Sequence, residues 1–225
     1  MELFRDLLYQ DPATPRLTVY TEATGARMDF SATTLDNWAA KVANMLLEEL
    51  DLTEDSRLLI DLPVGWQAAA IAFGALAAGV DFSLDPSLSV SDPGDVDVVF
   101  CSPERAGDHP GPDLVVVTSD PFGRGVEETG GTLGEGWIDF GLTVRFYGDT
   151  FAGSGPALAD LVSEAEREEL AGARALATGW TNDAGFARQV LAPLAAGGSV
   201  VIVAGFATAG RMDHIAEVER VTVRL

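Results

Sequence analysis

Two short turns carry the side chains that are best placed for ligand binding. The first turn spans residues 61–66 (DLPVGW) and the second spans residues 178–183 (TGWTND), and each follows a predicted strand and precedes a predicted helix. Ligands of open α/β sheets bind beside the carboxyl ends of strands. The candidate ligand-binding residues are therefore Asp61, Trp66, Thr178, Gly179, Trp180, Asn182 and Asp183. The alternative interpretation is that Thr181, Asn182 or Asp183 caps a helix and that both tryptophans pack in the core.

Residues 148–155 (GDTFAGSG) come nearest to a phosphate-binding loop. They contain the two glycines of the GxxxxGK[ST] pattern, but Ser154 stands where the lysine should be and Gly155 stands where the hydroxyl should be. The stretch thus lacks the cation and the magnesium ligand that phosphate transfer requires. We therefore prefer to interpret it as a plain connecting loop.

Other catalytic chemistry is poorly represented. His109 and His214 are far apart in the sequence, and the single cysteine, Cys101, can neither build a zinc cluster nor form an intrachain disulfide. No GxSxG motif is present, and Cys101 ends a predicted strand near no obvious base, which favours a buried structural thiol. We expect no catalytic residue, no cofactor and no metal site.

The charge balance argues against two classes of partner. The 225 residues include 35 acidic and 14 basic residues, for a net charge of −21, and Lys41 is the only lysine. Such a chain repels phosphate backbones and anionic lipids, so we expect neither a nucleic-acid nor a membrane partner. Lys41 falls off the apolar stripe of its predicted helix, and we expect its side chain to be solvated.

Several features favour a cytoplasmic protein. A single cysteine indicates a reducing compartment, and the N-terminus has early acidic residues and no long apolar core, so it does not resemble a signal peptide. Residues 189–210 carry no charge over a length that could span a bilayer. However, Pro193 and the pair Gly197–Gly198 divide this stretch into a predicted helix and a predicted buried strand.

The elements that would position the two turns alternate between strand and helix. After an N-terminal helix and a hairpin over residues 16–31, a helix is predicted to begin at Thr33, with Asp36 three residues later as in a capping box. Further strands are predicted at 57–61, 80–84, 96–101, 114–118, 142–147, 174–178, 199–203 and 221–225, and helices at 66–78, 156–172, 183–196 and 212–219. The predicted fold is α/β, with a doubly wound, mostly parallel sheet flanked by helices in a single domain over residues 1–225.

Three stretches of this chain resemble the adenylate-forming (AMP-binding, acyl-CoA synthetase-like) superfamily. Residues 29–50 (DFSATTLDNWAAKVANMLLEEL) are similar to the family's extended segment and Tyr-x-x-Leu helix. Residues 55–86 are similar to its strand, x-Pro turn and alanine-rich helix that precede an Asp-Pro strand end, and residues 186–205 (FARQVLAPLAAGGSVVIVAG) to a later helix-strand unit. The resemblance covers roughly residues 1–105 and 173–225, and it points to a short, actinobacterial-type branch. It implies the fold of the N-terminal part of an acyl-CoA synthetase large domain.

The departures from the family pattern bear on function. The family's phosphate loop should lie between residues 156–158 and Arg174, where this sequence has an acidic stretch, ADLVSEAEREEL. The later nucleotide-binding motifs and the C-terminal domain with the catalytic lysine would lie beyond Leu225. No catalytic residue of the family has a matching position here. We therefore expect a pseudoenzyme that does not adenylate carboxylates, with its physiological role left open.

Two alternatives remain. The chain could be a module that binds a small molecule (an acyl group, an adenylate or an aromatic acid), or an enzyme completed by a partner protein that supplies cations. The apolar strands at residues 199–203 and 221–225 could leave a sheet edge that needs covering, so a homodimer is also open.

Overall fold

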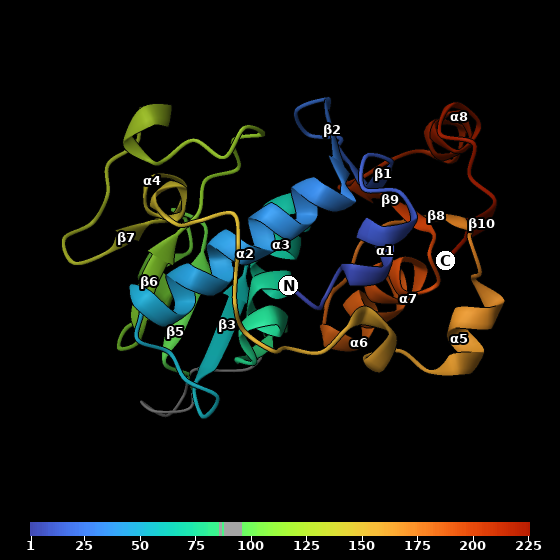
Figure 1. The fold of residues 1–225 in the computed structure, drawn as a ribbon. Coiled ribbons are helices and arrows are strands. Elements are labelled where there is room, and N and C mark those ends of the chain that lie inside the picture. Colours follow the sequence, from blue (N-terminus) through green and yellow to red (C-terminus); the bar gives the residue numbers. More distant parts are fainter. Residues whose placement is uncertain (86, 88–95) are drawn as a thin grey trace. The chain divides into compact units, whose positions relative to one another are not determined.

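The computed structural model describes residues 1–85, 87 and 96–225, which fall into two compact units (Figure 1). Unit 1 comprises Met1, Asn37–Pro63 and Gln67–Gly155, and unit 2 comprises Glu2–Asp36, Val64–Trp66 and Pro156–Leu225. Each unit contains a five-stranded sheet. The α/β class and the mostly parallel pairing are thus confirmed, with the strands divided between two sheets. A single folding domain that includes both units stays a prediction.

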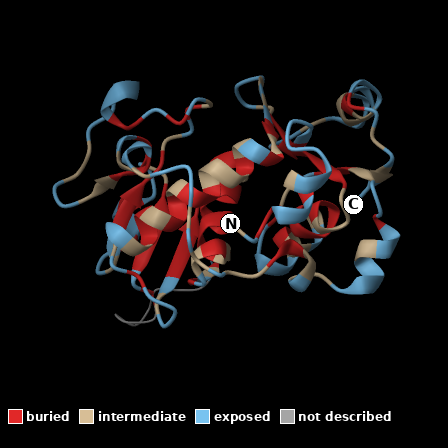
Figure 2. Cartoon of the chain, viewed as in Figure 1, coloured by how far each residue is buried: buried red, intermediate tan, exposed pale blue. Residues whose placement is uncertain are grey.

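The sheet of unit 1 is wholly parallel and has the order β4-β3-β5-β6-β7. Its strands are β3 (Arg57–Asp61), β4 (Asp81–Ser83), β5 (Val98–Cys101), β6 (Asp113–Val116) and β7 (Ile138–Asp139). Four of the five residues of β3 and all four of β5 are buried. This agrees with their uninterrupted apolar sequences, which predict a sheet covered on both faces. Figure 2 shows this burial along the strands. The helix α3 (Trp66–Ala78), which connects β3 to β4, is also almost entirely buried.

The sheet of unit 2 is mixed and has the order β10-β8-β9-β1-β2. The strands β1 (Pro15–Thr21) and β2 (Ala26–Ser31) form the predicted antiparallel hairpin, while β8 (Arg174–Ala177), β9 (Ser199–Ala204) and β10 (Val223–Arg224) pair in parallel. Its helices are α1 (Arg5–Gln10), α5 (Glu164–Glu169), α6 (Asp183–Phe186), α7 (Ala192–Ala195) and α8 (Ala209–Val218). A π-helical turn at Ala187–Leu191 joins α6 to α7.

The uncharged stretch at residues 189–210 forms this helical segment and then the buried strand β9, as predicted. Within the described ranges, none of the helices combines the length and the apolar character that crossing a membrane would require. Pro86, which the family resemblance includes, lies outside the described residues.

The predicted strand at residues 142–147 is wrong. This stretch lies in helix α4 (Phe140–Thr143) and a following 3₁₀ turn, Val144–Phe146. Asp139 precedes the helix, and its carboxylate accepts a hydrogen bond from the backbone N–H of Leu142. The alternating apolar residues of 142–147 indicate a strand, but the N-cap at Asp139 favours the start of a helix just before them.

The predicted helix over residues 156–172 is shorter than expected. Only a 3₁₀ turn (Leu158–Asp160) and α5 are helical. Ser163 starts α5 by accepting a hydrogen bond from the backbone N–H of Glu166, whose side chain accepts one in return from the N–H of Ser163. This capping box lies in the middle of the predicted helix and sets a later start.

The start of helix α2 (Ala32–Glu48) also differs from the prediction. The side chain of Ser31, and not that of Thr33, accepts the hydrogen bond from the backbone N–H of Thr34. Asp36 is half-buried, and its Oδ1 has no hydrogen-bond partner among the described residues. Burial therefore raises the pKa of the Asp36 carboxyl, where the capping box had predicted a satisfied side chain.

Candidate functional site

The second predicted turn follows β8 in unit 2, and Asn182 and Trp180 have structural contacts there. The side chain of Asn182 accepts a hydrogen bond of 2.9 Å from the backbone N–H of Gly185 and caps α6. Trp180 is 5% exposed and packs edge-on against Phe186, with ring centroids 5.0 Å apart. These contacts are the ones that helix capping and core packing would produce. Thr178, Asn182 and Asp183 are exposed, so their side chains lie at the surface of the turn.

Gly179, in the second turn, lies against Val64 of the first turn. Its φ of +95° is a backbone conformation that glycine adopts without strain, and a Cβ at this position would lie 2.5 Å from Cγ1 of Val64. The next tryptophan, Trp66, is 5% exposed and packs on Phe30 with 5.2 Å between ring centroids. Val64 and Trp66 therefore belong with the second turn in unit 2.

Asp61, the remaining candidate, ends β3 in unit 1 and has different neighbours. Its Oδ2 lies 2.7 Å from Nε2 of His109 and accepts a hydrogen bond of 2.8 Å from Nε of Arg105. The side chains of Asp61 and His109 are both buried, whereas that of Arg105 is about half exposed. We refer to these three residues as the Asp61 cluster. In the sequence His109 lies in a glycine- and proline-rich stretch, GDHPGPD, and nothing in this local pattern indicates a contact with Asp61.

The Asp61 cluster occupies a special place in its sheet. The chain leaves β3 toward β4 on one side and leaves β5 toward β6 on the other, so the connections diverge between the neighbouring strands β3 and β5. Asp61 and Cys101 are paired at the carboxyl ends of these two strands. Such a divergence is where open α/β sheets form ligand-binding crevices.

Cys101 does not add a nucleophile to this place. It is fully buried, and burial together with the nearby negative charge of Asp61 raises its pKa to about 11. The side chain is therefore a neutral thiol at physiological pH, and the predicted burial of Cys101 is confirmed. Within the described part of the chain, no three histidine, cysteine or acidic side chains are grouped so that they could hold a metal ion.

A cavity of about 310 Å³ adjoins the Asp61 cluster. Its lining includes His109, Pro110, Pro112, Asp113 and Trp137. Nε2 of the imidazole lies within hydrogen-bond distance of Asp61, and the same residue lines the cavity together with Trp137. The arrangement supports recognition of a ligand by one imidazole beside an aromatic wall.

The only lysine is not solvated as expected. Nζ of Lys41 donates a hydrogen bond of 2.7 Å to the carbonyl of Tyr147 and lies 2.8 Å from the carboxylate of Asp149. Asn44, one turn further along α2, donates to the carbonyls of Gly148 and Thr150. The glycine-rich stretch 148–155 is thus held against α2 of unit 1 over its first residues. These contacts agree with the interpretation of residues 148–155 as a connecting loop and not as a phosphate-binding loop.

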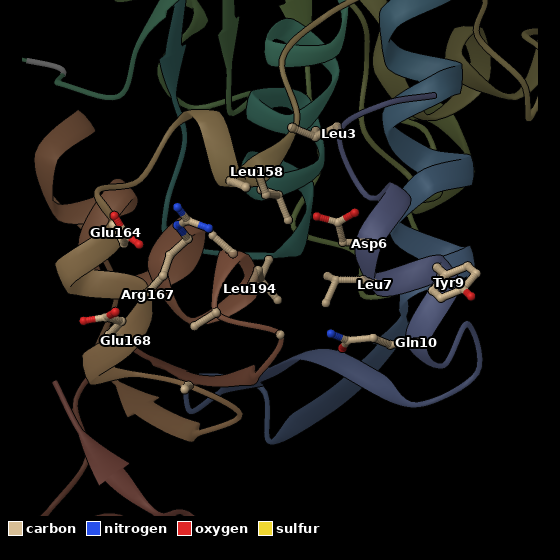
Figure 3. A pocket seen from close by; sticks show the side chains of 15 residues that line it. Leu3, Asp6, Leu7, Tyr9, Gln10, Leu158, Glu164, Arg167, Glu168 and Leu194 are labelled. Atoms are coloured by element: carbon tan, nitrogen blue, oxygen red, sulfur yellow. The ribbon is translucent and has the colours of Figure 1, made fainter.

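The helix α5 stands where the family resemblance required the phosphate loop. Its six residues, EAEREE, include four exposed glutamates and one arginine, Arg167. Together with α1 it borders a groove of about 550 Å³ in unit 2 (Figure 3). We call this cavity the α1–α5 groove, and its buried apolar floor includes Leu3, Leu7, Leu158 and Leu194.

Comparison with solved structures identifies the fold. The acyl-CoA synthetase of Brucella canis matches 96% of this chain with a TM-score of 0.72 and 17% identity. The benzoate CoA ligase of Burkholderia xenovorans LB400 matches 98% with a TM-score of 0.64 and 15% identity, and the fatty acid AMP ligase of Legionella pneumophila matches 98% with a TM-score of 0.68 and 12% identity. The chain therefore has the fold of the adenylate-forming enzymes, as the sequence resemblance indicated. It spans 45%, 48% and 42% of these three chains, respectively.

The particular family follows from a relative in Mycobacterium tuberculosis (strain ATCC 25618 / H37Rv), which is described as a "TIGR03089 family protein". The two proteins are 36% identical over 220 residues, which cover 88% of this chain and 86% of the relative. The chain belongs to the TIGR03089 family, in agreement with the predicted actinobacterial-type branch. No family model matches the chain.

Proposed function

We propose that this chain is a pseudoenzyme: a domain of the adenylate-forming fold that binds a partner or ligand without adenylating a carboxylate. The observation that carries the proposal is α5, an acidic helix at the place of the family's phosphate loop. Transfer of an adenylyl group requires cations and backbone N–H groups aimed at the phosphates. Four exposed glutamates at this place would instead repel them.

The side chains elsewhere support the same proposal. Lys41 is the only lysine, and its ammonium already contacts the carbonyl of Tyr147 and the carboxylate of Asp149. The net charge of −21 further disfavours the approach of a triphosphate.

The test is ATP–pyrophosphate exchange with the purified full chain across aliphatic, aromatic and amino-acid carboxylates. A carboxylate–CoA ligase of the same fold, assayed in parallel, serves as the positive control. We expect exchange at the level of the protein-free blank. Exchange above that blank with any of the acids would overturn the proposal.

A second candidate function is a small-molecule-binding module, which the Asp61 cluster and its cavity favour. The exposed side chains of the second turn, Thr178, Asn182 and Asp183, are the alternative place for such a ligand. The test is a thermal-shift screen with AMP, ATP, acyl-CoAs and aromatic acids. A ligand at one hundred times its Kd stabilises a protein by about 2.7 kcal/mol, or about 5 °C or more for a chain of this size. Shifts below about 1 °C throughout the screen would count against this candidate.

The third candidate, an enzyme completed by a cation-bearing partner, has no contact in the described residues that favours it. We keep it as an outcome of the exchange assay, repeated with host lysate added to the purified chain.

We further propose a cytoplasmic location, supported by the neutral, buried Cys101, and cell fractionation tests it. Light scattering of the purified protein tests whether it forms a homodimer.

A further inference from the structure

The α1–α5 groove is an open cavity lined by residues of α1, the 3₁₀ turn Leu158–Asp160, α5 and α7, all in unit 2. Figure 3 shows α1 on one side, α5 on the other and Leu158 and Leu194 between them. Leu3, Leu7, Leu158 and Leu194 are each at most 4% exposed, so they provide a preformed apolar floor. Small side chains at Ala195 and Ala196 continue the lining and leave room above it. The groove can therefore accept apolar side chains without rearrangement of its own core.

The rim of the groove carries an excess of negative charge. Asp6 on α1 and Glu164 and Glu168 on α5 line it, against one basic lining residue, Arg167, while Arg5, which is not among the lining residues, lies 3.6 Å from Asp6. This local excess adds to the net charge of −21 of the whole chain. An anionic ligand such as a fatty acid or a nucleotide would be repelled, whereas a basic one would be attracted.

Arg167 adds a second requirement. Figure 3 shows its side chain reaching from α5 into the groove, toward Leu158, while Asp6 reaches in from α1. Its Nε is buried and has no hydrogen-bond partner among the described residues. A ligand cannot reach this buried atom, but the terminal nitrogens of the same guanidinium can donate to the carbonyl oxygen of a bound main chain.

A further contact is available at the edge of the groove. Tyr9, which lines it from α1, is 92% exposed, so its ring is accessible to a ligand in the groove. Its ring could pack against the stem of a lysine or arginine and interact with the positive charge through its face.

We propose that the α1–α5 groove binds an amphipathic, basic peptide segment of a partner protein. Apolar side chains of the segment would contact the leucine floor, its lysines or arginines would pair with Asp6, Glu164 and Glu168, and a main-chain carbonyl would accept a hydrogen bond from Arg167. This inference rests on the proposed binding function and names the class of its partner.

The experiment uses a fluorescein-labelled helical peptide of leucine and lysine, about 15 residues long, titrated with the full chain and followed by fluorescence anisotropy. A peptide of the same length with glutamate in place of lysine is the charge control. We expect saturable binding of the leucine–lysine peptide that weakens with added salt, and no binding of the leucine–glutamate peptide. Absence of saturable binding, or equal binding of both peptides, would overturn the inference.

A matched pair of variants separates the groove from general attraction to an acidic protein. Glu168 lines the groove, whereas its neighbour Glu169 on the same helix does not, and both are exposed. Glu168→Lys and Glu169→Lys change the net charge equally. We expect about fivefold weaker binding for Glu168→Lys and a change of less than about twofold for Glu169→Lys. Equal losses would show that the peptide binds by net charge alone and would overturn the proposal.

A competition arm distinguishes a peptide partner from a small cation. Spermidine carries positive charge without an apolar face, so it should displace the peptide no better than an equal ionic strength of sodium chloride. Specific displacement by spermidine would contradict the peptide and indicate a small polyamine. Pyrophosphate exchange is measured separately, so an active enzyme that still binds the peptide at Glu168 would refute only the absence of adenylation.

Discussion

The two turns that the sequence singled out on the same grounds have different surroundings. After β3, Asp61 meets Arg105 and His109 from the loop that follows β5, and His109 lines a cavity. After β8, Asn182 caps its own helix and Trp180 packs against Phe186 within the same segment. A polar residue whose partners come from a distant loop is positioned by the topology of the sheet, whereas one whose partners are three residues away serves local structure first. The Asp61 cluster is therefore the stronger ligand candidate of the two.

Trp180→Ala should give the largest effect. Removing a buried indole costs about 3–5 kcal/mol of the free energy of unfolding. Urea denaturation measures it, with Thr181→Ala, an exposed neighbour, as the control that should change stability by less than about 0.5 kcal/mol. A Trp180→Ala protein of nearly normal stability would mean that the indole belongs to a ligand site and not to the core.

Gly179→Ala should be the next most damaging change. The added Cβ meets Val64, and alanine at a φ of +95° is strained, so we expect a loss of about 2–4 kcal/mol. The double variant Gly179→Ala/Val64→Ala should lose less than the sum of the two single changes because the smaller side chain removes the clash. Strict additivity in urea denaturation would contradict the contact between the two turns.

Asp61→Asn tests the first turn. Loss of the carboxylate leaves the buried His109 without its charged partner and leaves Arg105 with only its longer contact to Asp108, and we expect a loss of about 2 kcal/mol in thermal unfolding. The matched control is Asp108→Asn, because Asp108 is exposed and lies 3.6 Å from the same arginine. If the two variants lose equal stability, the cluster is no more than a surface ion pair.

Asn182→Ala should cost about 1 kcal/mol, the usual contribution of an N-cap. Ser163→Ala, at the N-cap of the exposed helix α5, offers a comparison of the same kind. Denaturant titration of both variants, combined with the ligand screen, sharpens the assignment. If Asn182→Ala changes the free energy of ligand binding more than the free energy of unfolding, the second turn would be a ligand-binding site.

The smallest effect concerns the reactivity of Cys101. Because its pKa is raised to about 11, little thiolate exists at pH 8, and alkylation of the native protein by iodoacetamide should be slow and should increase with pH. The neighbouring carboxylate contributes to the raised pKa, so Asp61→Asn should lower the pKa slightly and speed the reaction in the folded protein. An unchanged rate in a folded variant would indicate that burial alone protects the thiol.

Sequence patterns predicted the elements with local signals well. The strand at residues 57–61 and the helix at 66–78 agree with the structure at both ends, since an apolar run, a proline-containing turn and a terminal glycine mark them. The strand prediction for residues 142–147 is wrong because the N-cap residue, Asp139, lies before the alternating segment on which the prediction rests. Periodicity describes which face is buried, but a capping side chain decides which kind of element begins.

Contacts between distant residues escaped prediction for a different reason. His109 reaches Asp61 across 48 positions, and Lys41 reaches Tyr147 across 106. No local pattern encodes such separations, because they depend on which strands become neighbours and in which order. The sequence does not predict the strand order β4-β3-β5-β6-β7. Without that order, the residues that contact Asp61 cannot be predicted either.

The contacts of Lys41 also have a consequence for chemical labelling. An amine-reactive reagent meets only one side-chain amine in this sequence, and that amine is bound to the carbonyl of Tyr147 and the carboxylate of Asp149. Acylation requires a free, neutral amine, so the reagent must wait until the loop separates from α2. The rate at which Lys41 itself is labelled, measured by mass spectrometry on the peptide that contains it, would therefore report how often this loop detaches from the helix.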